Sequence, residues 1–312
     1  MTTIAALSGG VGGAKLVLGF CRHLGDREVT ILTNTGDDFE HLGLYVSPDL
    51  DTVMYTLSGL SNQDTGWGRD KETWNFMRSL EVLGGESWFS LGDKDLATIV
   101  ERTRRLKLGQ TLTEVTRDFA TRLGVNAQIL PMSDDPVRTQ VLTQHGELSF
   151  QHYFVRDACK PVVTGFRFDG FDVASANPAW FHALSDKNLR AVVICPSNPF
   201  ISIDPILSLP GVRTALCNVN VPVVAVSPIV GTEAIKGPTA KMMRELGYVL
   251  SANSVAQHYE GLLDGFVLDN SDDVNLDMFQ IPVLRTPIIM NTLDDRMRLA
   301  RDILEFAETL AI

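Results

Sequence analysis

Cysteine is scarce in this sequence, and the spacing of its cysteines excludes two classes of protein. The 312 residues contain four cysteines, and no two of them form a Cys-x-x-Cys pair. A structural zinc site or a disulfide-stabilised scaffold would need more closely spaced cysteines. Four isolated thiols suit the reducing cytoplasm, where we expect the protein to reside.

Positive charge and long apolar runs are also lacking. The formal net charge is −11, and no stretch is rich in Lys and Arg. Binding to nucleic acids depends on clustered basic side chains, so we expect no nucleic-acid partner. No segment approaches the roughly 20 apolar residues of a membrane span. The first apolar run is interrupted by glycines and lacks the basic residues of a signal peptide, so we expect no membrane partner.

The common motifs of hydrolases and metalloenzymes are missing as well. The six histidines form no His-x-x-x-His pair, and the chain has no Gly-x-Ser-x-Gly elbow. What remains is a set of aspartates, glycines and a few lysines. These residue types are typical of metal-assisted phosphoryl chemistry.

The most informative segment is a glycine-rich turn that follows the apolar run at residues 4–7. It contains Gly9, Gly10, Gly12 and Gly13, and Lys15 lies just inside the helical pattern that comes next. A strand, a glycine turn and a helix N-terminus present backbone N–H groups to a phosphate, and a lysine adds positive potential. The spacing matches neither a P-loop, which needs Gly-Lys-Ser/Thr, nor the dinucleotide fingerprint, whose third glycine would fall at Lys15. We predict phosphate binding, with a tight turn that binds no ligand as the alternative.

Apolar segments of strand length alternate with helical patterns along the chain. Buried strands are expected at residues 4–7, 29–32, 191–195, 221–226, 265–268 and 287–290. Nearly continuous apolar strands between helices indicate a mostly parallel sheet with helices on both faces, and hence a Rossmann-like α/β fold. We predict one α/β domain over residues 1–312, with a helical and irregular cap inserted at 60–175. A final helix at 294–310 is expected to pack along an edge.

Polar and acidic clusters follow several of these strands, and ligands of open α/β sheets bind at the carboxyl ends of the strands. Asp37 follows the second strand, and Asp49 and Asp51 lie at the start of a short helical run. Two carboxylates this close repel each other unless a cation joins them, and Mg²⁺ held by carboxylates and substrate phosphates is the natural partner. The alternative is ordinary capping of the helix N-terminus. For Asp37, a ribose contact is a further option.

Three other segments carry polar groups that suit a ligand. Ser197 and Asn198, between two prolines, offer a hydroxyl and an amide to a base or a ribose. Lys236 lies in a basic turn that opens a helix, which suits a phosphate as well as it suits a surface helix start. Lys94 lies in a charged turn ahead of another helix. From the residues alone, a solvated Lys94 beside helix-capping aspartates is the simpler interpretation.

Taken in order, these segments resemble the 2-phospho-L-lactate transferase family of coenzyme F420 biosynthesis. The resemblance extends from residue 8 to about residue 265. The matching segments are 8–16, 34–38, 47–52, 67–68, 91–95, 130–137, 196–199, 202–205, 227–229 and 236–238. Each segment alone is a weak signal, whereas the ordered set is specific. Lys94 and Ile99 depart from the common pattern, because many relatives carry arginine and histidine there.

The resemblance implies a transferase that moves a phospholactyl-type group, 2-phospho-L-lactate or phosphoenolpyruvate, from a guanosine diphosphate-linked donor. The implied acceptor is 7,8-didemethyl-8-hydroxy-5-deazariboflavin (Fo), and the products are coenzyme F420-0, or its dehydro form, and GMP. Mg²⁺ would bind Asp49 and Asp51, and the catalytic candidates are these two residues and Asp37. Asp51, Lys94 and Trp67 would contact the deazaflavin. The residues implied in nucleotide and phosphate binding are Gly9, Gly10, Gly12, Gly13, Lys15, Ser197, Asn198 and Lys236.

Two other functions compete with this interpretation. A nucleotide-sugar-binding regulator with the same core would keep the glycine turn but would need neither the Asp49 and Asp51 pair nor a deazaflavin pocket. An oxidoreductase is disfavoured by the missing third glycine. No motif distinguishes a lactyl, enolpyruvyl or glyceryl donor, since these groups differ by few atoms. The apolar edge strands and the resemblance favour a homodimer.

Overall fold

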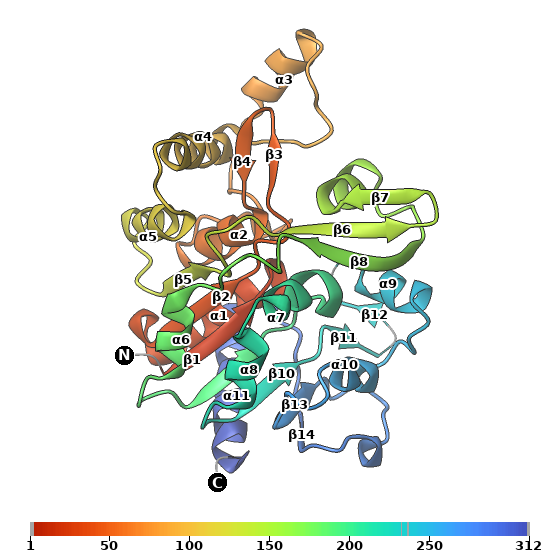
Figure 1. Cartoon of the computed structure of the whole chain (residues 1–312). Helices are drawn as coiled ribbons and strands as arrows, with labels where there is room; N and C mark the ends of the chain where they lie inside the picture. Colours follow the sequence, from red (N-terminus) through yellow and green to blue (C-terminus); the bar gives the residue numbers. More distant parts are fainter. Residues whose placement is uncertain (1–2, 232, 236, 311–312) are drawn as a thin grey trace.

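The computed structural model describes residues 3–231, 233–235 and 237–310, and a parallel sheet lies at the centre of these residues (Figure 1). Seven strands of the described chain pair in the order β14-β13-β10-β9-β1-β2-β5, and every neighbouring pair is parallel. The strands are β1 (Ile4–Ser8), β2 (Val29–Thr33), β5 (Gln128–Pro131), β9 (Ala191–Ile194), β10 (Val223–Val226), β13 (Gly265–Leu268) and β14 (Val283–Arg285). The strand order reverses between β1 and β9, as in doubly wound folds. The predicted Rossmann-like α/β fold is confirmed.

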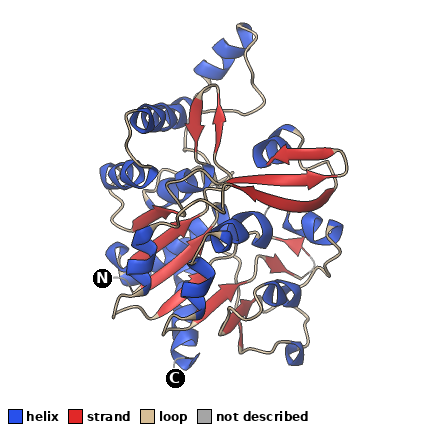
Figure 2. Cartoon of the chain, in the orientation of Figure 1, coloured by secondary structure: helices blue, strands red, loops and turns tan. Residues whose placement is uncertain are grey.

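Successive side chains of the central strands enter two separate cores, one on each face of the sheet. Ile4 and Ala6 belong to one core, whereas Ala5 and Leu7 belong to the other. This explains the continuous apolar runs, because both faces of each strand are buried. The first core is completed by α1 (Val11–Leu24), α2 (Pro48–Leu57), α5 (Leu112–Arg122) and α11 (Leu293–Leu310). The second is completed by α6 (Pro178–Leu184), α7 (Asp204–Ser208), α8 (Val212–Cys217), α9 (Thr239–Glu245) and α10 (Ala252–His258) (Figure 2).

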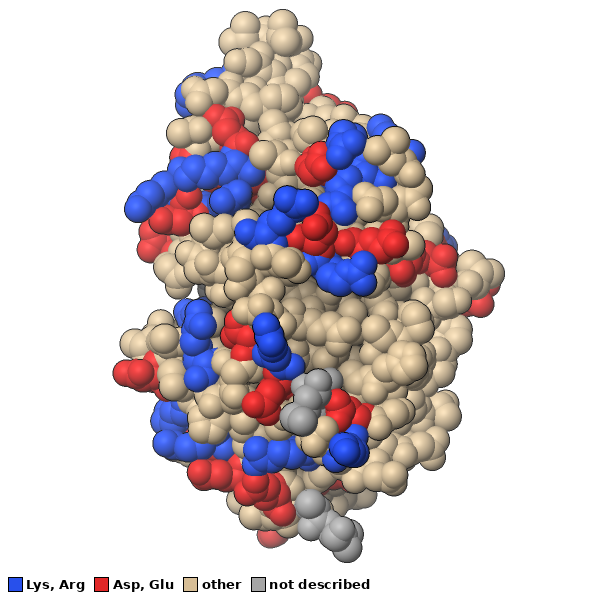
Figure 3. All heavy atoms as spheres, turned by 90° about the vertical axis from the view of Figure 1, so that its left-hand side faces the viewer, with Lys and Arg blue, Asp and Glu red and all other residues tan. Residues whose placement is uncertain are grey.

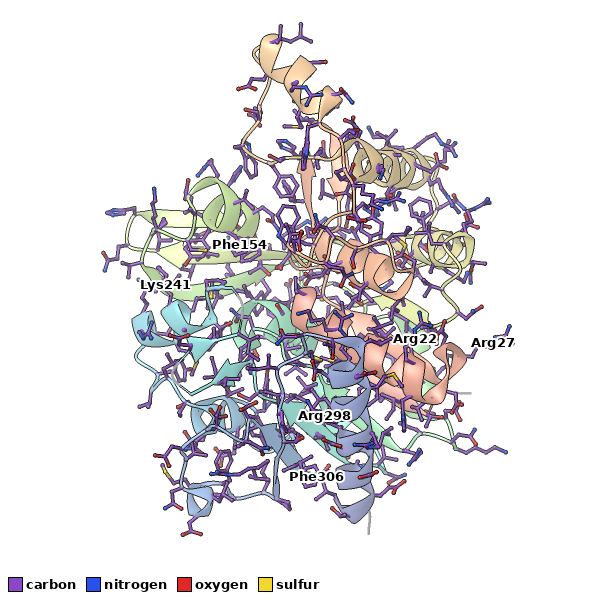
Figure 4. All side chains as sticks on the ribbon, turned by 180° about the vertical axis from the view of Figure 1, so that it is seen from behind. Arg22, Arg27, Phe154, Lys241, Arg298 and Phe306 are labelled. Carbon is purple, nitrogen blue, oxygen red and sulfur yellow. The ribbon has the colours of Figure 1, made fainter. Side chains whose placement is uncertain are left out.

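The C-terminal helix α11 lies on a face of the sheet, so the expectation that it packs along an edge is wrong. It runs beside α1 and contacts the inner strands β10 and β13. Figure 4 shows it across the back of the molecule, with Arg298 and Phe306 on it. The two helices approach closely at Gly19, where a Cβ atom would lie 2.2 Å from the carbonyl oxygen of Arg296. The buried stripe of Leu299, Ala300 and Ile303 explains this position.

The prediction of a strand at residues 287–290 is also wrong, because the seventh strand of the sheet is β14 at Val283–Arg285. Pro287 has no N–H group to donate to a neighbouring strand. The N–H of Ile288 donates instead to Asp269 Oδ2 at 2.8 Å, so a side chain takes the place of a ladder bond. The segment therefore crosses the carboxyl end of the sheet as a loop.

The remaining elements stand outside the central sheet. At one end are the hairpin β3 (Phe39–His41) and β4 (Leu44–Val46), α3 (Asn75–Val82) and α4 (Asp93–Lys107) (Figure 1). An antiparallel sheet of β6 (Arg138–Thr143), β7 (Gly146–Ser149) and β8 (Val163–Asp169) stands beside them. The short elements are η1 (Asp26–Glu28), η2 (His152–Arg156), η3 (Pro199–Ile203), β11 (Ile229–Val230), β12 (Glu233–Ala234) and η4 (Leu276–Met278).

The expected insertion at 60–175 needs a correction. It is not continuous, because α5 and β5 lie within it and belong to the core: β5 pairs with β2 along its length. Only the segments before α5 and after β5 stand outside the central sheet. None of the described helices combines the length and the apolar character that crossing a membrane requires.

Candidate active site

A cavity of about 1050 Å³ opens where the strand order of the central sheet reverses. Its floor contains the turn after β1 and residues 196–198, which follow β9. These are the two strands between which a doubly wound sheet binds its ligand. The first turn of α2, the segments 65–68 and 88–90, η2 and residues 288–291 contribute the walls. The crevice predicted at the carboxyl ends of the strands is therefore present.

The glycine turn forms one side of this cavity. Gly10 is the N-cap of α1, and no side chain in the part of the chain that the structure describes caps this helix. The first N–H groups of a helix have no partner within it, so those of α1 are available to an anion. Gly10 and Gly12 line the cavity. The N–H of Gly9 donates to Ser197 Oγ at 3.1 Å instead, and Gly13 packs against the side chain of Ser8.

Close contacts explain why two of these positions need glycine. A Cβ atom on Gly10 would lie 2.5 Å from Asp49 Oδ1, and one on Gly12 would lie 2.2 Å from the carbonyl oxygen of Pro196. Neither glycine has a positive φ, so the requirement is one of space and not of backbone conformation. The glycines allow α1, α2 and the turn after β9 to converge.

Three of the other residues expected to bind the nucleotide line the cavity, and the fourth lies outside the described residues. Lys15 lines the cavity, and its ammonium donates to the carbonyl oxygen of Met290 at 3.1 Å. Ser197 and Asn198 also line the cavity. Asn198 Oδ1 accepts from the N–H of Phe200 at 3.0 Å and so begins η3. Lys236 lies outside the described residues.

Asp37 and Asp49 are brought together beside Asn34. Asp37 lies in the turn after β2, and Asp49 lies in the first turn of α2. Asn34 is fully buried and donates to Asp49 Oδ2 at 3.1 Å. Burial raises the pKa of Asp49 to about 7. Burial and then the charge of Asp49 raise the pKa of Asp37 well above its ordinary value, and Asp37 Oδ1 is buried without a hydrogen-bond partner in the described part of the chain.

Asp51 has a different partner. Arg102, from α4, donates to both of its carboxylate oxygens, with Nη1 lying 3.0 Å from Oδ2. Burial raises the pKa of Asp51, and the positive charge of Arg102 opposes this. One turn further along α2, Tyr55 donates to Asp95 Oδ1 at 2.7 Å. Burial and then the charge of Asp51 raise the pKa of Asp95 to about 7.

The alternative that Asp49 and Asp51 cap α2 is wrong. Their carboxylates accept from the side chains of Asn34 and Arg102, and no side chain caps this helix. Ser47, at the N-cap position, donates to Asp38 at 2.8 Å. Both aspartates are thus free of the backbone and line the cavity.

The simpler interpretation of Lys94 is right about its exposure, but the expected capping of α4 by Asp93 or Asp95 is wrong. Its ammonium donates to the carbonyl oxygens of Asp70 and Lys71, at 2.9 and 2.7 Å. The carboxylate of Glu72, and not a neighbouring aspartate, accepts from the first N–H groups of α4. Asp93 accepts instead from residues at the start of α3. Lys94 is absent from the described cavity lining, and it fixes the loop that carries Trp67.

An aromatic wall lines the same cavity as the carboxylates. Trp67, Trp88, Phe89 and Phe154 line it. Trp88 also packs edge-on against Phe89, with ring centroids 5.7 Å apart. Flat aromatic surfaces of this kind suit a planar ring system. Sequence analysis singled out only Trp67, because a tryptophan has no local signal of facing a ligand.

Sequence analysis also missed Asn34, Asp95 and Arg102. Asn34 and Asp95 lie inside segments that carried the resemblance, at 34–38 and 91–95. Arg102 lies seven residues after Asp95, which places both on one face of α4. That spacing was the available sign that Asp95 and Arg102 face the same neighbouring element. Among the described residues, no three His, Cys, Asp or Glu side chains form a group that would hold a metal ion by themselves.

Comparison with known proteins places the chain in a family. The family model for the 2-phospho-L-lactate transferase CofD matches residues 4–283. A phosphoenolpyruvate transferase from Streptomyces griseus is 38% identical over 314 residues, with 98% of each chain covered. A 2-phospho-L-lactate transferase from Methanocaldococcus jannaschii is 38% identical over 311 residues, covering 98% of this chain and 99% of its own.

The fold is also found among solved structures. A member of the UPF0052 family from Bacillus halodurans superposes with a TM-score of 0.64 at 12% identity, covering 97% of this chain and 99% of its own. At this identity the likeness concerns the fold alone. The family match and the full-length relatives carry the assignment, and the chain belongs to the 2-phospho-L-lactate transferase family of enzymes.

Proposed function

We propose that the enzyme transfers 2-phospho-L-lactate or phosphoenolpyruvate from a guanosine diphosphate-linked donor to Fo, giving coenzyme F420-0 or its dehydro form and GMP. One observation carries the proposal: a single cavity joins an uncapped helix N-terminus, buried carboxylates and an aromatic wall. The helix N-terminus suits a diphosphate, the carboxylates suit a divalent cation, and the aromatic wall suits a planar acceptor.

In this proposal, the donor diphosphate lies against the N-terminus of α1, within reach of Lys15. Ser197 and Asn198 face the nucleoside. The deazaflavin lies against the aromatic wall, with its ribityl chain directed at the carboxylates. The terminal ribityl hydroxyl attacks the distal phosphorus, the bond to the bridging oxygen breaks, and GMP leaves. Asp51 accepts the proton of the attacking hydroxyl.

A magnesium ion fits the carboxylates of this site. Asp37 Oδ1 is buried and has no hydrogen-bond partner among the described residues, and Asp49 lies close enough to raise the pKa of Asp37. Two such carboxylates are stabilised by a hard cation that takes its other ligands from phosphate oxygens and water. We assign Asp49 and Asp37 to the ion, because the positive charge of Arg102 at Asp51, the second ligand expected from the sequence, would repel a cation there. When bound, the ion offsets negative charge on the phosphate oxygens.

The test is mass spectrometry of the purified enzyme with Mg²⁺, Fo and each of three guanylylated donors, carrying phospholactate, phosphoenolpyruvate or phosphoglycerate. A deazaflavin phosphodiester that forms together with GMP supports the proposal, and its mass identifies the donor. The lactyl and enolpyruvyl products differ by two hydrogen atoms. The matched control is Asp49→Asn, for which we expect no product. Tight nucleotide-sugar binding without product from any donor would favour the regulator instead.

The assembly state is tested separately. We propose a homodimer, which light scattering of the purified protein at several concentrations checks. A constant mass equal to one chain would contradict it.

A further inference from the structure

Helices α2 and α4 face each other through two polar pairs. Asp51 pairs with Arg102, and Tyr55 pairs with Asp95. The partners are four residues apart on α2 and seven apart on α4, so each set lies along one helix face. The order is reversed, since the earlier residue of α2 meets the later residue of α4. The two helices therefore run antiparallel at this contact, and α4 comes from outside the central sheet.

The pair of Asp51 and Arg102 is buried. The side chains are 8% and 2% exposed, and both guanidinium Nη atoms donate to the carboxylate. Removing two charges from water offsets most of their attraction, so such a pair contributes little net stability. A bidentate guanidinium does, however, fix the plane and direction of a carboxylate. The pair is thus better explained by the geometry that it imposes than by stability.

Only one partner of this pair reaches the cavity. Asp51, Tyr55 and Asp95 line it, whereas Arg102 lies behind Asp51 and does not appear in the described lining. The two hydrogen bonds of the Arg102 guanidinium therefore act on the cavity through Asp51. Arg104 and Arg105, on the same helix, pair instead with Glu101 and Asp118. Basic and acidic side chains are intermixed on the side of the molecule where α4 and α5 lie (Figure 3).

We infer that Arg102 is a positioning residue, whose two-pronged hydrogen bond orients the Asp51 carboxylate toward the hydroxyl of the acceptor. The inference rests on the proposed function, in which Asp51 faces the acceptor and the glycine turn faces the donor. Its specific consequence is that Arg102 governs affinity for the acceptor and leaves affinity for the nucleotide unchanged.

The test is Arg102→Lys, which keeps the positive charge and loses the fork. Dissociation constants are measured without Mg²⁺, for Fo by its own absorption and for GDP by calorimetry. We expect the dissociation constant of Fo to rise about tenfold, as for the loss of one hydrogen bond to a charged group. The constant for GDP stays within about twofold, which also reports that the variant is folded. In turnover, the KM for Fo rises while the KM for the donor does not.

A double-mutant cycle separates positioning from a general structural effect. In the Asp51→Asn protein, adding Arg102→Lys should change Fo binding by less than about twofold, because the carboxylate that Arg102 orients is already gone. Arg104→Lys, at an exposed position of the same helix, is the matched control and should change neither affinity.

Three results would overturn the inference while leaving the proposed function intact. The first is wild-type Fo affinity in Arg102→Lys. The second is an equal loss of Fo and GDP affinity, and the third is an equal effect of Arg102→Lys with and without Asp51. If the unsubstituted enzyme neither binds Fo nor forms product, the proposed function fails, and this inference fails with it.

Discussion

Replacement of Gly12 by alanine separates the steric role of the glycine turn from its conformational role. Gly12 is the second residue of α1, and its φ is not in the left-handed region. Helix propensity alone would favour alanine there by about 1 kcal/mol. A Cβ atom, however, would lie 2.2 Å from the carbonyl oxygen of Pro196, a backbone atom that cannot rotate away. Ordinary contacts of carbon atoms are about 3.5 Å long, so the two segments must separate by about 1 Å.

The expected magnitudes differ for stability and for activity. Forcing a methyl group into a packed contact costs about 1–3 kcal/mol, from which the gain in helix propensity is subtracted. We expect Gly12→Ala to lower the free energy of unfolding by about 0–2 kcal/mol. The separation occurs where β1 and β9 present the glycine turn and Ser197 to the ligand. A 1 Å misplacement costs about 100-fold in rate, so we expect kcat/KM for the donor to fall by about this factor.

Urea denaturation and steady-state GMP release test the two expectations. Gly165→Ala is the matched control, since its Cβ would meet Leu142 Cδ1 at 3.4 Å, an ordinary contact. The reasoning is refuted if Gly12→Ala retains the kcat/KM of the unsubstituted enzyme. It is equally refuted if activity and stability fall in parallel, since the loss would then follow from unfolding.

Three further predictions concern the carboxylates and the loop of Trp67. EDTA should abolish GMP release, and Mg²⁺ should restore it. Asp49→Asn should lower the restored rate at least about 100-fold, because stabilisation of the phosphate charge by the ion is worth several kcal/mol. GMP release that EDTA does not affect would contradict this prediction. The pKa of Asp95 is raised from 3.8 to about 7, so the folded protein binds a proton at Asp95 more tightly than the unfolded chain does. The contribution of this proton to the free energy of unfolding therefore falls by up to about 1.4 kcal/mol per pH unit as the pH rises from 4 to 7. Asp95→Asn should flatten this fall in urea denaturation, and an unchanged slope would count against the assignment. Lys94→Ala removes the hydrogen bonds to the carbonyl oxygens of residues 70 and 71, so the KM for Fo should rise about tenfold. The KM for the guanylylated substrate should stay unchanged, and Lys94→Arg should retain most of the affinity for Fo.

Local patterns in the sequence predicted five of the seven described strands of the central sheet, and the floor of the cavity. The runs at 4–7 and 191–195 are buried on both faces, so their apolar character is continuous and readable. The glycine turn was readable because close approach to Pro196 excludes a side chain. The expected strand at 287–290 failed because an apolar run also suits a buried loop. There, Asp269 accepts from Ile288 in place of a neighbouring strand.

The pairings around the carboxylates could not be read from local patterns. Asp51 and Arg102 are 51 positions apart, and Tyr55 and Asp95 are 40 apart. Their encounter depends on how α4 packs against α2, which no periodicity within either helix specifies. The sequence thus suggested a cation between Asp49 and Asp51, because proximity along the chain was the only available guide. The fold instead brings Asp37 near Asp49 and gives Asp51 a guanidinium.

The balance of charge in the cavity connects these observations. The acidic side chains of the described lining are Asp37, Asp49, Asp51, Asp95 and Glu233. The basic side chain of that lining is Lys15, and Arg102 adds a second positive charge from behind. A donor diphosphate would enter a site that repels it unless protons or a cation first offset the carboxylates. Burial raises the pKa of both Asp37 and Asp49, and the charge of Asp49 raises that of Asp37 further, so a proton and a cation would compete for this pair. In the proposed function, the cation and the diphosphate would therefore bind favourably only together, which is the arrangement that a phosphoryl transfer requires.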